Sequence, residues 1–309
     1  MLSHDLDWLN FPLFFFWNIG EDQTPDHHWN FVLDHFLIAD PELSAVHDII
    51  TADLDGDGGF EIITMSGKFR AGVTRSKTLD LRWYKIIPNP YKYWQKNRIG
   101  DSVHAGIAAG DIDRDGDIDI VRSNVWFENK EGGRSWSEHQ IVNVPWDLEC
   151  KIEVCDINKD GRLDVVLTEA EIIGARAAWF EAPIDPKKEE WTAHILEQSD
   201  NEERGPYHSM AVADFDNDGD LDIFIGEMEH LGVKPYRWFI WENIFRDENP
   251  VFIERVILDI GLGTHEAVIG DVDGDGDIDI CGKLWRPKND NSNEGNNHAD
   301  FLENLLISK

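Results

Sequence analysis

Five short acidic segments are the part of this sequence whose residue types and spacing are best suited to chemistry. Each segment has Asp or Asn at positions 1, 3 and 5, glycine at position 6 and a carboxylate at position 9. The five sets are Asp53/Asp55/Asp57/Gly58/Glu61, Asp111/Asp113/Asp115/Gly116/Asp119, Asp156/Asn158/Asp160/Gly161/Asp164, Asp214/Asp216/Asp218/Gly219/Asp222 and Asp271/Asp273/Asp275/Gly276/Asp279. Oxygens at alternate positions can point into a curling loop, and glycine allows the sharp turn at position 6. With a backbone carbonyl at position 7, each segment is expected to form an oxygen cage for Ca²⁺.

The flanks of these segments distinguish them from calcium loops of the helix–loop–helix type. Such a loop carries Glu at position 12. The residues found at position 12 are Thr64, Arg122, Leu167, Ile225 and Gly282. The sequence before and after each loop alternates as strands do. We therefore expect structural calcium between two strands, where the ion neutralises carboxylates that would otherwise repel one another. The alternative is five acidic turns without metal.

The formal net charge of −33 is concentrated in these loops. Nineteen carboxylates stand at the ligand positions, and five bound Ca²⁺ ions would bring the net charge to about −23. This acidity argues against binding to nucleic acid or to an anionic membrane. The chain also lacks a nucleotide-binding glycine loop, a serine-hydrolase elbow and a Cys-x-x-Cys metal pattern.

The spacing of the loops predicts an all-β repeat fold. The first loop residues are 58, 45, 58 and 57 positions apart, and an aromatic strand such as Trp126-Phe-Glu-Asn129 follows most of the loops. Four strands per repeat is the blade of a β-propeller, so we expect a single domain over residues 1–309 with five blades. A strand within residues 12–38 would close the ring against the C-terminal blade at 265–305. Six blades are the alternative, if residues 6–17 build part of another blade.

These loops, entered by strands such as His265-Glu-Ala-Val-Ile-Gly-Asp271 and followed by Trp-Phe-Glu-Asn strands, resemble the FG-GAP/VCBS repeat propellers. The resemblance covers roughly residues 29–305 and implies a calcium-binding propeller. Members of that group include the integrin α-subunit propellers, the family 11 rhamnogalacturonan lyases and the propeller of fungal aldos-2-ulose dehydratase. This chain departs from the last type by being short and by lacking a cupin-like region. Because one fold hosts many functions, the resemblance to lyases and dehydratases is an analogy.

The compartment and the oligomeric state stay open at this stage. Three cysteines, Cys150, Cys155 and Cys281, cannot form a disulfide framework, whereas calcium loops favour a secreted or cell-envelope protein. The apolar segment at 11–17 is too short to span a bilayer, and no signal peptide is visible. We expect no membrane insertion.

A second set of reactive side chains is expected at the face opposite the calcium loops. Strand A of each repeat enters its loop and strand B returns, so the start of A and the end of B lie at one face, near the axis of a propeller. His47, His208 and His265 stand six positions before a loop, His104 stands seven before, and the third repeat has Glu149 and Lys151 there. Asn124, Glu169 and Glu227 end strand B, with Arg122, Lys283 and Trp285 close by.

This ring of imidazoles, acids and cations supports two versions of a sugar-directed pocket. In one, His47, His208 and His265 bind a divalent transition metal that acidifies the carbon next to a substrate carboxylate or carbonyl. In the other, a His or Lys151 is the general base and Glu169 or Glu227 is the acid or binds sugar hydroxyls. Tyr207 could protonate the leaving group, and Trp285 could stack on a sugar ring.

Both versions predict a carbohydrate lyase or dehydratase that acts by β-elimination. The competing class is a non-catalytic propeller that binds a glycan or a protein and needs no metal bound by histidine. A third possibility is a scaffold without a small-molecule site, in which the histidines only cap strands or satisfy backbone groups.

Overall fold

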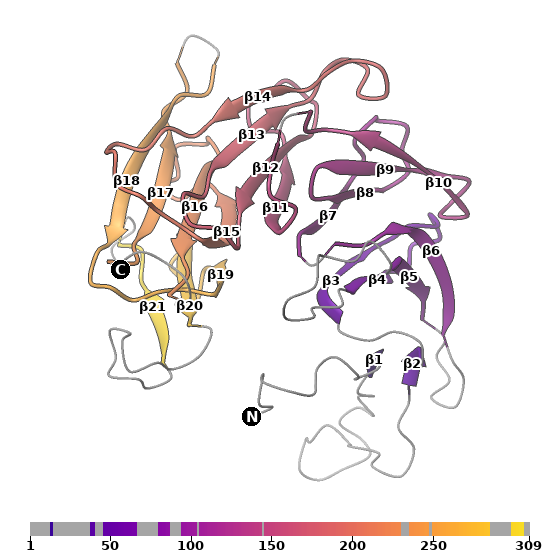
Figure 1. The fold of residues 1–309 in the computed structure, drawn as a ribbon, viewed down its shortest axis with the longest axis horizontal. Coiled ribbons are helices and arrows are strands. Elements are labelled where there is room, and N and C mark those ends of the chain that lie inside the picture. Colours follow the sequence, from indigo (N-terminus) through magenta and orange to yellow (C-terminus); the bar gives the residue numbers. More distant parts are fainter. Residues whose placement is uncertain are drawn as a thin grey trace.

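A computed structural model describes residues 13–14, 38–40, 46–66, 80–86, 94–103, 105–143, 145–229, 235–246, 249–284 and 298–305. Every regular element in this part of the chain is a strand (Figure 1). Since the described residues form no helix, they also provide none that is long and apolar enough to cross a membrane. The expected all-β class is confirmed.

The described strands form five antiparallel sheets in which the strand order follows the chain. The first sheet contains β3 (Val46–Ala52), β4 (Glu61–Ser66), β5 (Asp80–Lys85) and β6 (Gln95–Asp101). The second contains β7 (Ile107–Gly110), β8 (Asp119–Arg122), β9 (Val125–Lys130) and β10 (Ser135–Gln140). The third contains β11 (Cys150–Cys155), β12 (Asp164–Glu169), β13 (Ala177–Glu181) and β14 (Thr192–Ile195).

The remaining described strands form the fourth and fifth sheets and a separate pair. The fourth sheet contains β15 (Tyr207–Ala213), β16 (Asp222–Glu227), β17 (Trp238–Asn243) and β18 (Phe252–Leu258). The fifth contains three described strands, β19 (Glu266–Gly270), β20 (Asp279–Lys283) and β21 (Ala299–Leu302). A separate antiparallel pair joins β1 (Leu13–Phe14) to β2 (Ile38–Asp40). Each acidic loop joins the first strand of a sheet to the second, as the sequence predicts.

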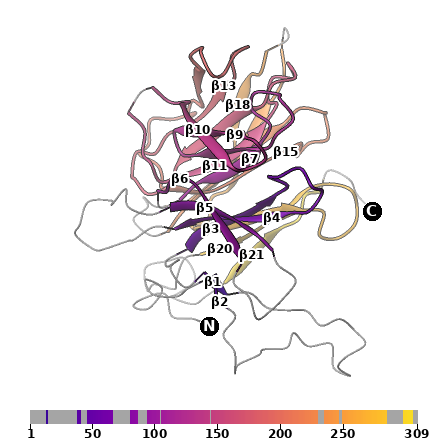
Figure 2. The same ribbon diagram turned by 90° about the vertical axis from the view of Figure 1, so that its right-hand side faces the viewer.

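The five sheets follow one another along an arc, with their first strands on the inside (Figure 1). β3, β7, β11, β15 and β19 contact one another in that order. The arc is open between the fifth and the first sheet, and a view turned by 90° again places these two sheets at the same end of the molecule (Figure 2). The first strands of all five sheets therefore surround one shared centre.

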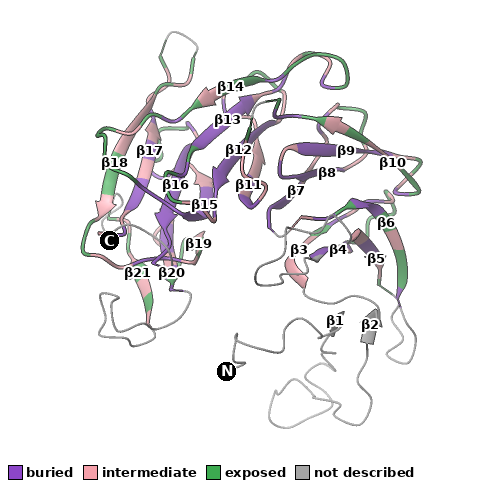
Figure 3. Ribbon diagram, in the orientation of Figure 1, coloured by how far each residue is buried: buried purple, intermediate pink, exposed green. Residues whose placement is uncertain are grey.

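The core lies between neighbouring sheets. Four apolar clusters join the first sheet to the second, the second to the third, the third to the fourth and the fourth to the fifth. The aromatic third strands contribute the largest side chains, including Trp126 and Trp179. Figure 3 shows that β8, β9, β12, β13 and β16 are largely buried, whereas the outer strands β6, β10, β14 and β18 carry exposed residues. Each of the middle sheets is thus stabilised by packing on both faces.

The two sheets at the ends of the arc carry apolar side chains on the faces without a described neighbour. On the fifth sheet, Val268 and Val272 are both 64% exposed and Phe301 is 47% exposed. On the first sheet, Ile49 is 53% and Phe60 is 70% exposed. The residues that match Val272 in the other sheets are all buried: Leu54, Ile112, Ile157 and Phe215. The repeat therefore builds two apolar faces that in every other sheet lie against a neighbour.

The predicted closure of the ring falls mainly on residues outside the described part. Residues 15–37, which include the strand expected to join the C-terminal sheet, are not described, and β1 pairs with β2. Residues 6–12 of the six-blade alternative are likewise outside the described residues. Both closure schemes stay predictions.

Candidate functional site

The five acidic loops share one hydrogen-bonding pattern. In the loop that begins at Asp214, the carboxylate at position 1 accepts backbone N–H groups from positions 5 and 6, at 3.0 and 2.9 Å. Asp53, Asp111, Asp156 and Asp271 accept the same two amides in their loops. The glycine at position 6 has a positive φ in every loop, for example 93° at Gly219. The sequence-predicted turn is therefore present five times, since glycine adopts this conformation without strain.

In four of the five loops, the carboxylate at position 9 ties the loop to the end of the third strand of its sheet. One oxygen of Asp222 accepts the N–H of Phe215 at 3.0 Å, and the other accepts the N–H of Asn243 at 2.8 Å. Asp119, Asp164 and Asp279 make the same two bonds. Burial raises the pKa of Asp119 to about 8 and the pKa values of Asp164 and Asp222 to about 7. These carboxylates hold the backbone in place, although burial opposes their charge.

Four of the loops gather carboxylate oxygens that could hold a metal ion. Such oxygens lie within 4.8 Å of one another in the sets Asp53/Asp55/Asp57, Asp111/Asp113/Asp115, Asp214/Asp216/Asp218 and Asp271/Asp273/Asp279. In the first set, Oδ1 of Asp55 is buried and forms no hydrogen bond with a described residue. Oxygen-only donor sets with several carboxylates fit Ca²⁺, which would satisfy that oxygen and relieve the repulsion.

The third loop departs from this arrangement, because position 3 is Asn158 where the other loops have Asp. Oδ1 of Asn158 accepts the N–H of Asp160 at 3.1 Å, and its Nδ2 donates to the carboxylate of Asp160, also at 3.1 Å. Both ends of the amide are thus used inside the loop, and a cation would have to displace the second of these bonds. Oδ1 of Asp113, Asp216 and Asp273 makes the same contact at this position in the other loops, so the predicted role of Asn158 as a metal ligand stays a prediction. We expect the third loop to bind Ca²⁺ most weakly, since an amide adds no charge to the donor set.

Basic side chains already approach four of the loops, since Lys159 pairs with Asp220 in the fourth. Lys85 contacts Asp55 and Asp57 in the first loop, and Lys187 lies 2.5 Å from Asp113 in the second. Arg162 contacts Asp160 in the third loop. These ion pairs offset part of the loop charge, so a bound cation would compete with them.

At the opposite ends of the first strands, two histidines occupy irregular positions. The pairing register shifts between Val46 and Asp48 in β3 and between Tyr207 and Ser209 in β15. His47 and His208 are the extra residues at these two bulges. A bulge re-aims a side chain that regular alternation would place elsewhere.

His208 and His265 form a stacked pair near the centre. Their ring centroids are 4.0 Å apart, and the rings are inclined by 22°. Nδ1 of the fully buried His208 donates to the carbonyl oxygen of His265 at 2.6 Å, and its Nε2 lies 3.2 Å from a carboxylate oxygen of Glu171. Two electron-pair donors at that distance need a proton or a metal ion between them. A backbone acceptor on the other nitrogen is a typical support of a metal-binding histidine.

His208, His265 and Glu266 place one ligand atom each within 4.8 Å of one another. Burial, together with the neighbouring His208, Lys283 and Lys151, holds the pKa of His265 far below its usual range, so this imidazole is neutral. Two imidazoles and a carboxylate fit a divalent transition metal better than calcium. We call these three residues, together with their polar neighbours Glu171, Lys151, His47 and Asp48, the axial cluster.

The axial cluster draws on four of the five sheets. Nζ of Lys151, from β11, lies 3.0 and 3.2 Å from the carboxylate oxygens of Glu266 on β19. Nδ1 of His47 lies 2.7 Å from Asp48, whose carboxylate also accepts the N–H of Gly106. His47 is close enough to His265 to contribute to its lowered pKa. A base, a cation and a set of metal ligands are therefore brought together from distant parts of the chain.

Other residues singled out in the sequence serve the backbone. Glu169 accepts the N–H groups of Asp147 and Arg176 and pairs with the Arg176 guanidinium at 2.6 Å. Glu227 accepts the N–H groups of Gly205 and Arg237. Both carboxylates are at most 2% exposed. Their geometry favours anchoring of strand ends over acid catalysis.

The remaining predicted residues are dispersed. Arg122 is buried over Phe127, and one guanidinium nitrogen donates to the carbonyl oxygen of Asp101. The backbone carbonyl groups of Asn124 and Glu149 accept N–H groups of Ile141 and Ala170. The carbonyl oxygen of Lys283 accepts the His265 N–H at 2.8 Å, and Tyr207 lines a separate cavity between the third and fourth sheets. His104 and Trp285 lie outside the described residues.

Three members of the axial cluster were missed by the sequence prediction: Asp48, Glu171 and Glu266. Glu266 follows His265 directly, and simple strand alternation puts such neighbours on opposite faces. Glu171 lies beyond the end of β12, outside the offset used to find candidates. A search for acids next to the repeated histidine position would have found Asp48 and Glu266.

Comparisons with known proteins support the repeat but not a function. Residues 214–281, from the fourth acidic loop into β20, match the family model of the FG-GAP-like repeat. A search of curated proteins finds no match. Among solved structures, the V. cholerae biofilm matrix protein Bap1 is 15% identical with a TM-score of 0.43, and the alignment covers 86% of this chain and 39% of that chain.

The Photorhabdus luminescens Tc holotoxin pore is 14% identical with a TM-score of 0.38, over 87% of this chain and 12% of that chain. The chain thus spans much less than half of either structure. At these scores, neither likeness identifies a fold or a function. The expected FG-GAP resemblance is confirmed for residues 214–281.

The buried carboxyls predict how the stability of the calcium-free protein depends on pH. Their folded-state pKa values of about 7 to 8 exceed the ordinary value of 3.8, so the folded state binds more protons than the unfolded state in this window. The free energy of unfolding in chelator should therefore fall as the pH rises from about 5 to about 8. Thermal denaturation across this range measures the effect.

Saturating calcium should reverse this slope, because protons and Ca²⁺ compete for carboxylates. The variant Asp119→Asn keeps an acceptor oxygen but does not titrate, so it should flatten the slope measured in chelator. Calcium-free stability that rises towards pH 8, or identical profiles with and without calcium, would contradict this account of the loops.

Proposed function

We propose that the chain is a calcium-stabilised β-propeller of five blades that carries out β-elimination on a sugar or an acidic polysaccharide at its axial cluster. The observation that carries the enzymatic part is the meeting of His208, His265 and Glu266 beside Lys151 and the His47–Asp48 pair. Calcium in the five loops and a divalent transition metal at the axial cluster are the cofactors of this proposal. A carbohydrate is its partner.

The closed ring is supported by the two exposed apolar faces. Val272 and Phe301 on the fifth sheet face the side where every other sheet has a following neighbour, and Phe60 on the first sheet faces the side where the others have a preceding one. Contact between these faces would remove the exposure. Burial of one such side chain stabilises by about 1.5–3 kcal/mol.

The reaction needs a base, an acid and charge stabilisation at one place. When bound, the axial metal would polarise the substrate carboxylate or carbonyl group and so acidify the adjacent C–H. The His47–Asp48 pair suits the base, because a carboxylate on Nδ1 orients the imidazole ring. The electron pair released from that carbon forms the double bond as the neighbouring C–O bond breaks. The Lys151 ammonium can supply the proton to the leaving oxygen.

A non-catalytic propeller that binds glycans or proteins is the second candidate. It would use the same end of the molecule and require neither His47 nor a transition metal. The cavity between the third and fourth sheets favours this candidate, because a ligand bound there would not need the residues of the axial cluster.

Ring closure predicts that Phe301→Asp and Phe60→Asp each lower the free energy of unfolding by about 2 kcal/mol or more, since each places a charge in an apolar contact. Chemical denaturation measures this change. If the first and fifth sheets pack directly, the double variant should cost less than the sum of the single variants. The matched control Ile184→Asp, at a 73% exposed site outside both faces, should change stability by less than about 0.5 kcal/mol. Single variants as stable as this control would refute closure.

The axial cluster predicts different losses for different residues. His47→Ala should lower the rate of unsaturated-product formation from acidic polysaccharides by about 10²–10⁴-fold and leave Mn²⁺ binding unchanged, because it removes the base alone. Glu266→Gln and His208→Ala should lose Mn²⁺ in equilibrium dialysis as well as turnover. His194→Ala, on the outer strand β14, is the control.

Two results would count against the enzymatic proposal. One is an absence of elimination by the wild-type protein on every acidic polysaccharide tested with Mn²⁺ or Zn²⁺ present. The other is wild-type turnover in His47→Ala or Glu266→Gln. Sugar binding without turnover would move the assignment to the non-catalytic class.

A further inference from the structure

A cavity of about 410 Å³ lies between the third and fourth sheets, beside the axial cluster but not part of it. Its walls come from the start of β13, the end of β14, the segment 196–204 and the first residue of β15. Its volume falls within the usual range for small-molecule sites. Tyr207 lines this cavity whereas the next residue, His208, belongs to the axial cluster. β15 therefore separates the two places.

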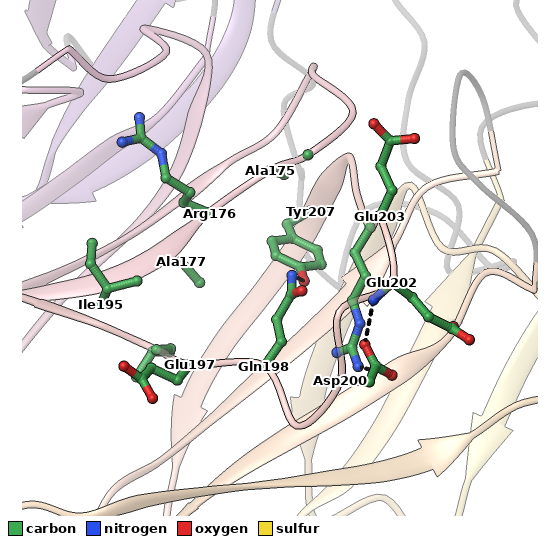
Figure 4. A pocket seen from close by; sticks show the side chains of 13 residues that line it. Ala175, Arg176, Ala177, Ile195, Glu197, Gln198, Asp200, Glu202, Glu203 and Tyr207 are labelled. Carbon is green, nitrogen blue, oxygen red and sulfur yellow. Dashed lines mark hydrogen bonds and ion pairs between the residues drawn. The ribbon is translucent and has the colours of Figure 1, made fainter.

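The polar centre of the cavity has a hydrogen-bond donor to spare. Figure 4 shows the Tyr207 ring and the Gln198 amide facing each other in the middle of the lining, and Nε2 of Gln198 donates to the Tyr207 hydroxyl oxygen at 3.0 Å. The Arg204 guanidinium, which is also a donor, lies near the hydroxyl, and the Glu227 carboxylate acts on it as well but accepts N–H groups of Gly205 and Arg237. The phenol is 1% exposed, and burial raises its pKa, so it keeps its proton. In the described part of the chain, that proton has no acceptor.

One hydrogen-bond donor is left without an acceptor whichever way the Gln198 amide is turned. If the amide is reversed, Oε1 accepts the Tyr207 proton and Nε2 is left without an acceptor. Nε of Arg204, which is 2% exposed, also forms no hydrogen bond with a described residue. A buried donor without an acceptor costs about 1–3 kcal/mol. The cavity is therefore prepared for an atom that accepts hydrogen bonds.

The rim of the cavity carries hydrogen-bond acceptors where its centre carries donors. Glu197 and Glu203 lie on opposite sides of Tyr207 (Figure 4), and neither carboxylate forms a hydrogen bond or an ion pair within the described residues. The other two acids of the lining are engaged, since Asp200 pairs with Arg204 and Glu202 pairs with Arg237. The free carboxylates accept hydrogen bonds and repel anions. Both carboxylates are exposed to solvent, so they offer acceptors to an occupant that donates hydrogen bonds.

These two features favour a neutral ligand over a charged one, although Arg176 and Arg204 also line the cavity. An ammonium group donates to Glu197 and Glu203 but cannot accept the central proton. A carboxylate or phosphate accepts the proton but cannot donate to the rim, and the acids of the lining repel it. A neutral hydroxyl does both. The aliphatic part of the wall, with Ala175, Ala177, Ile195 and Leu196, suits the C–H face of a sugar ring.

We propose that the cavity between the third and fourth sheets is a second binding site, which takes one neutral sugar unit with hydroxyl groups between Tyr207/Gln198 and the rim carboxylates. The site requires neither calcium nor the axial metal. It stands independently of the elimination chemistry.

The test is titration of the whole chain with neutral monosaccharides, followed by saturation-transfer NMR and calorimetry. The probes are the methyl glycosides of glucose, galactose, mannose, fucose and N-acetylglucosamine. Tyr207→Phe keeps the ring but loses the hydroxyl, so it should weaken binding of the best probe roughly tenfold, about the value of one hydrogen bond. Gln198→Leu and the double variant Glu197→Gln/Glu203→Gln should also weaken binding.

Charged sugars and a variant of the axial cluster serve as controls. Glucosamine and glucuronate should bind more weakly than the neutral sugar of the same ring, and the axial variant Glu266→Gln should bind like the wild type. Tighter binding of either charged probe, binding by Tyr207→Phe equal to the wild type, or no binding of any neutral probe at millimolar concentration would overturn the proposal. Loss of turnover in Glu266→Gln with sugar binding retained keeps this proposal separate from the proposed elimination. Melting temperatures of all variants exclude unfolding as a cause.

Discussion

The constraint on which the rest of the structure depends is the burial of carboxylates in the acidic loops. Each position-9 acid bonds to the backbone of its own loop, and four of the five also bond to the end of the third strand. Removing the acid would leave buried amides without acceptors. Keeping it places a charge next to several others in a poorly solvated position. Lysines and arginines reach four of the loops, and an oxygen-coordinated cation would satisfy the whole set. This opposition between hydrogen bonding and charge burial recurs in all five loops, and each loop joins the first two strands of one sheet.

In that arrangement, the acidic loops and the axial cluster lie at opposite ends of the strands. The loops lie at one end of the first and second strands, so the other end is free of their charge and collects side chains from several sheets. His47 and His208 reach the centre through bulges, and His265 lies between a buried threonine and the start of β19. The axial cluster is assembled by the arrangement of sheets and by no single segment. The cavity between the third and fourth sheets arises in a similar way, from a long connection that packs Arg204 against Phe239 beneath it.

The sequence predicted the local and repeated features well, since they depend on neighbouring residues. The loops, their glycine turns and the strands around them follow from residue type and spacing. Asn158 differs from the Asp residues at this position because its amide also donates to the neighbouring Asp160 carboxylate, a contact that a pattern treating Asn and Asp alike does not predict.

Features that depend on long-range packing were harder to predict. Glu169 and Glu227 were assigned by the repeat logic, yet nearby amides and Arg176 occupy their oxygens. No spacing rule indicates this, because the partners come from connections of irregular length. Glu266 and Glu171 join the cluster through contacts across sheets, and the cavity has no motif in the sequence.

The most direct test of the central claim is the calcium stoichiometry of the intact chain, measured by elemental analysis after exhaustive dialysis against low calcium. The account predicts about five Ca²⁺ ions per chain, one for each oxygen-rich loop, with the third loop the first to lose its ion. The variant Asp214→Ala/Asp216→Ala, in the fourth loop, should lose one ion and melt at a lower temperature. A folded, cooperative wild-type protein that retains no calcium, and whose melting temperature calcium does not change, would contradict the account.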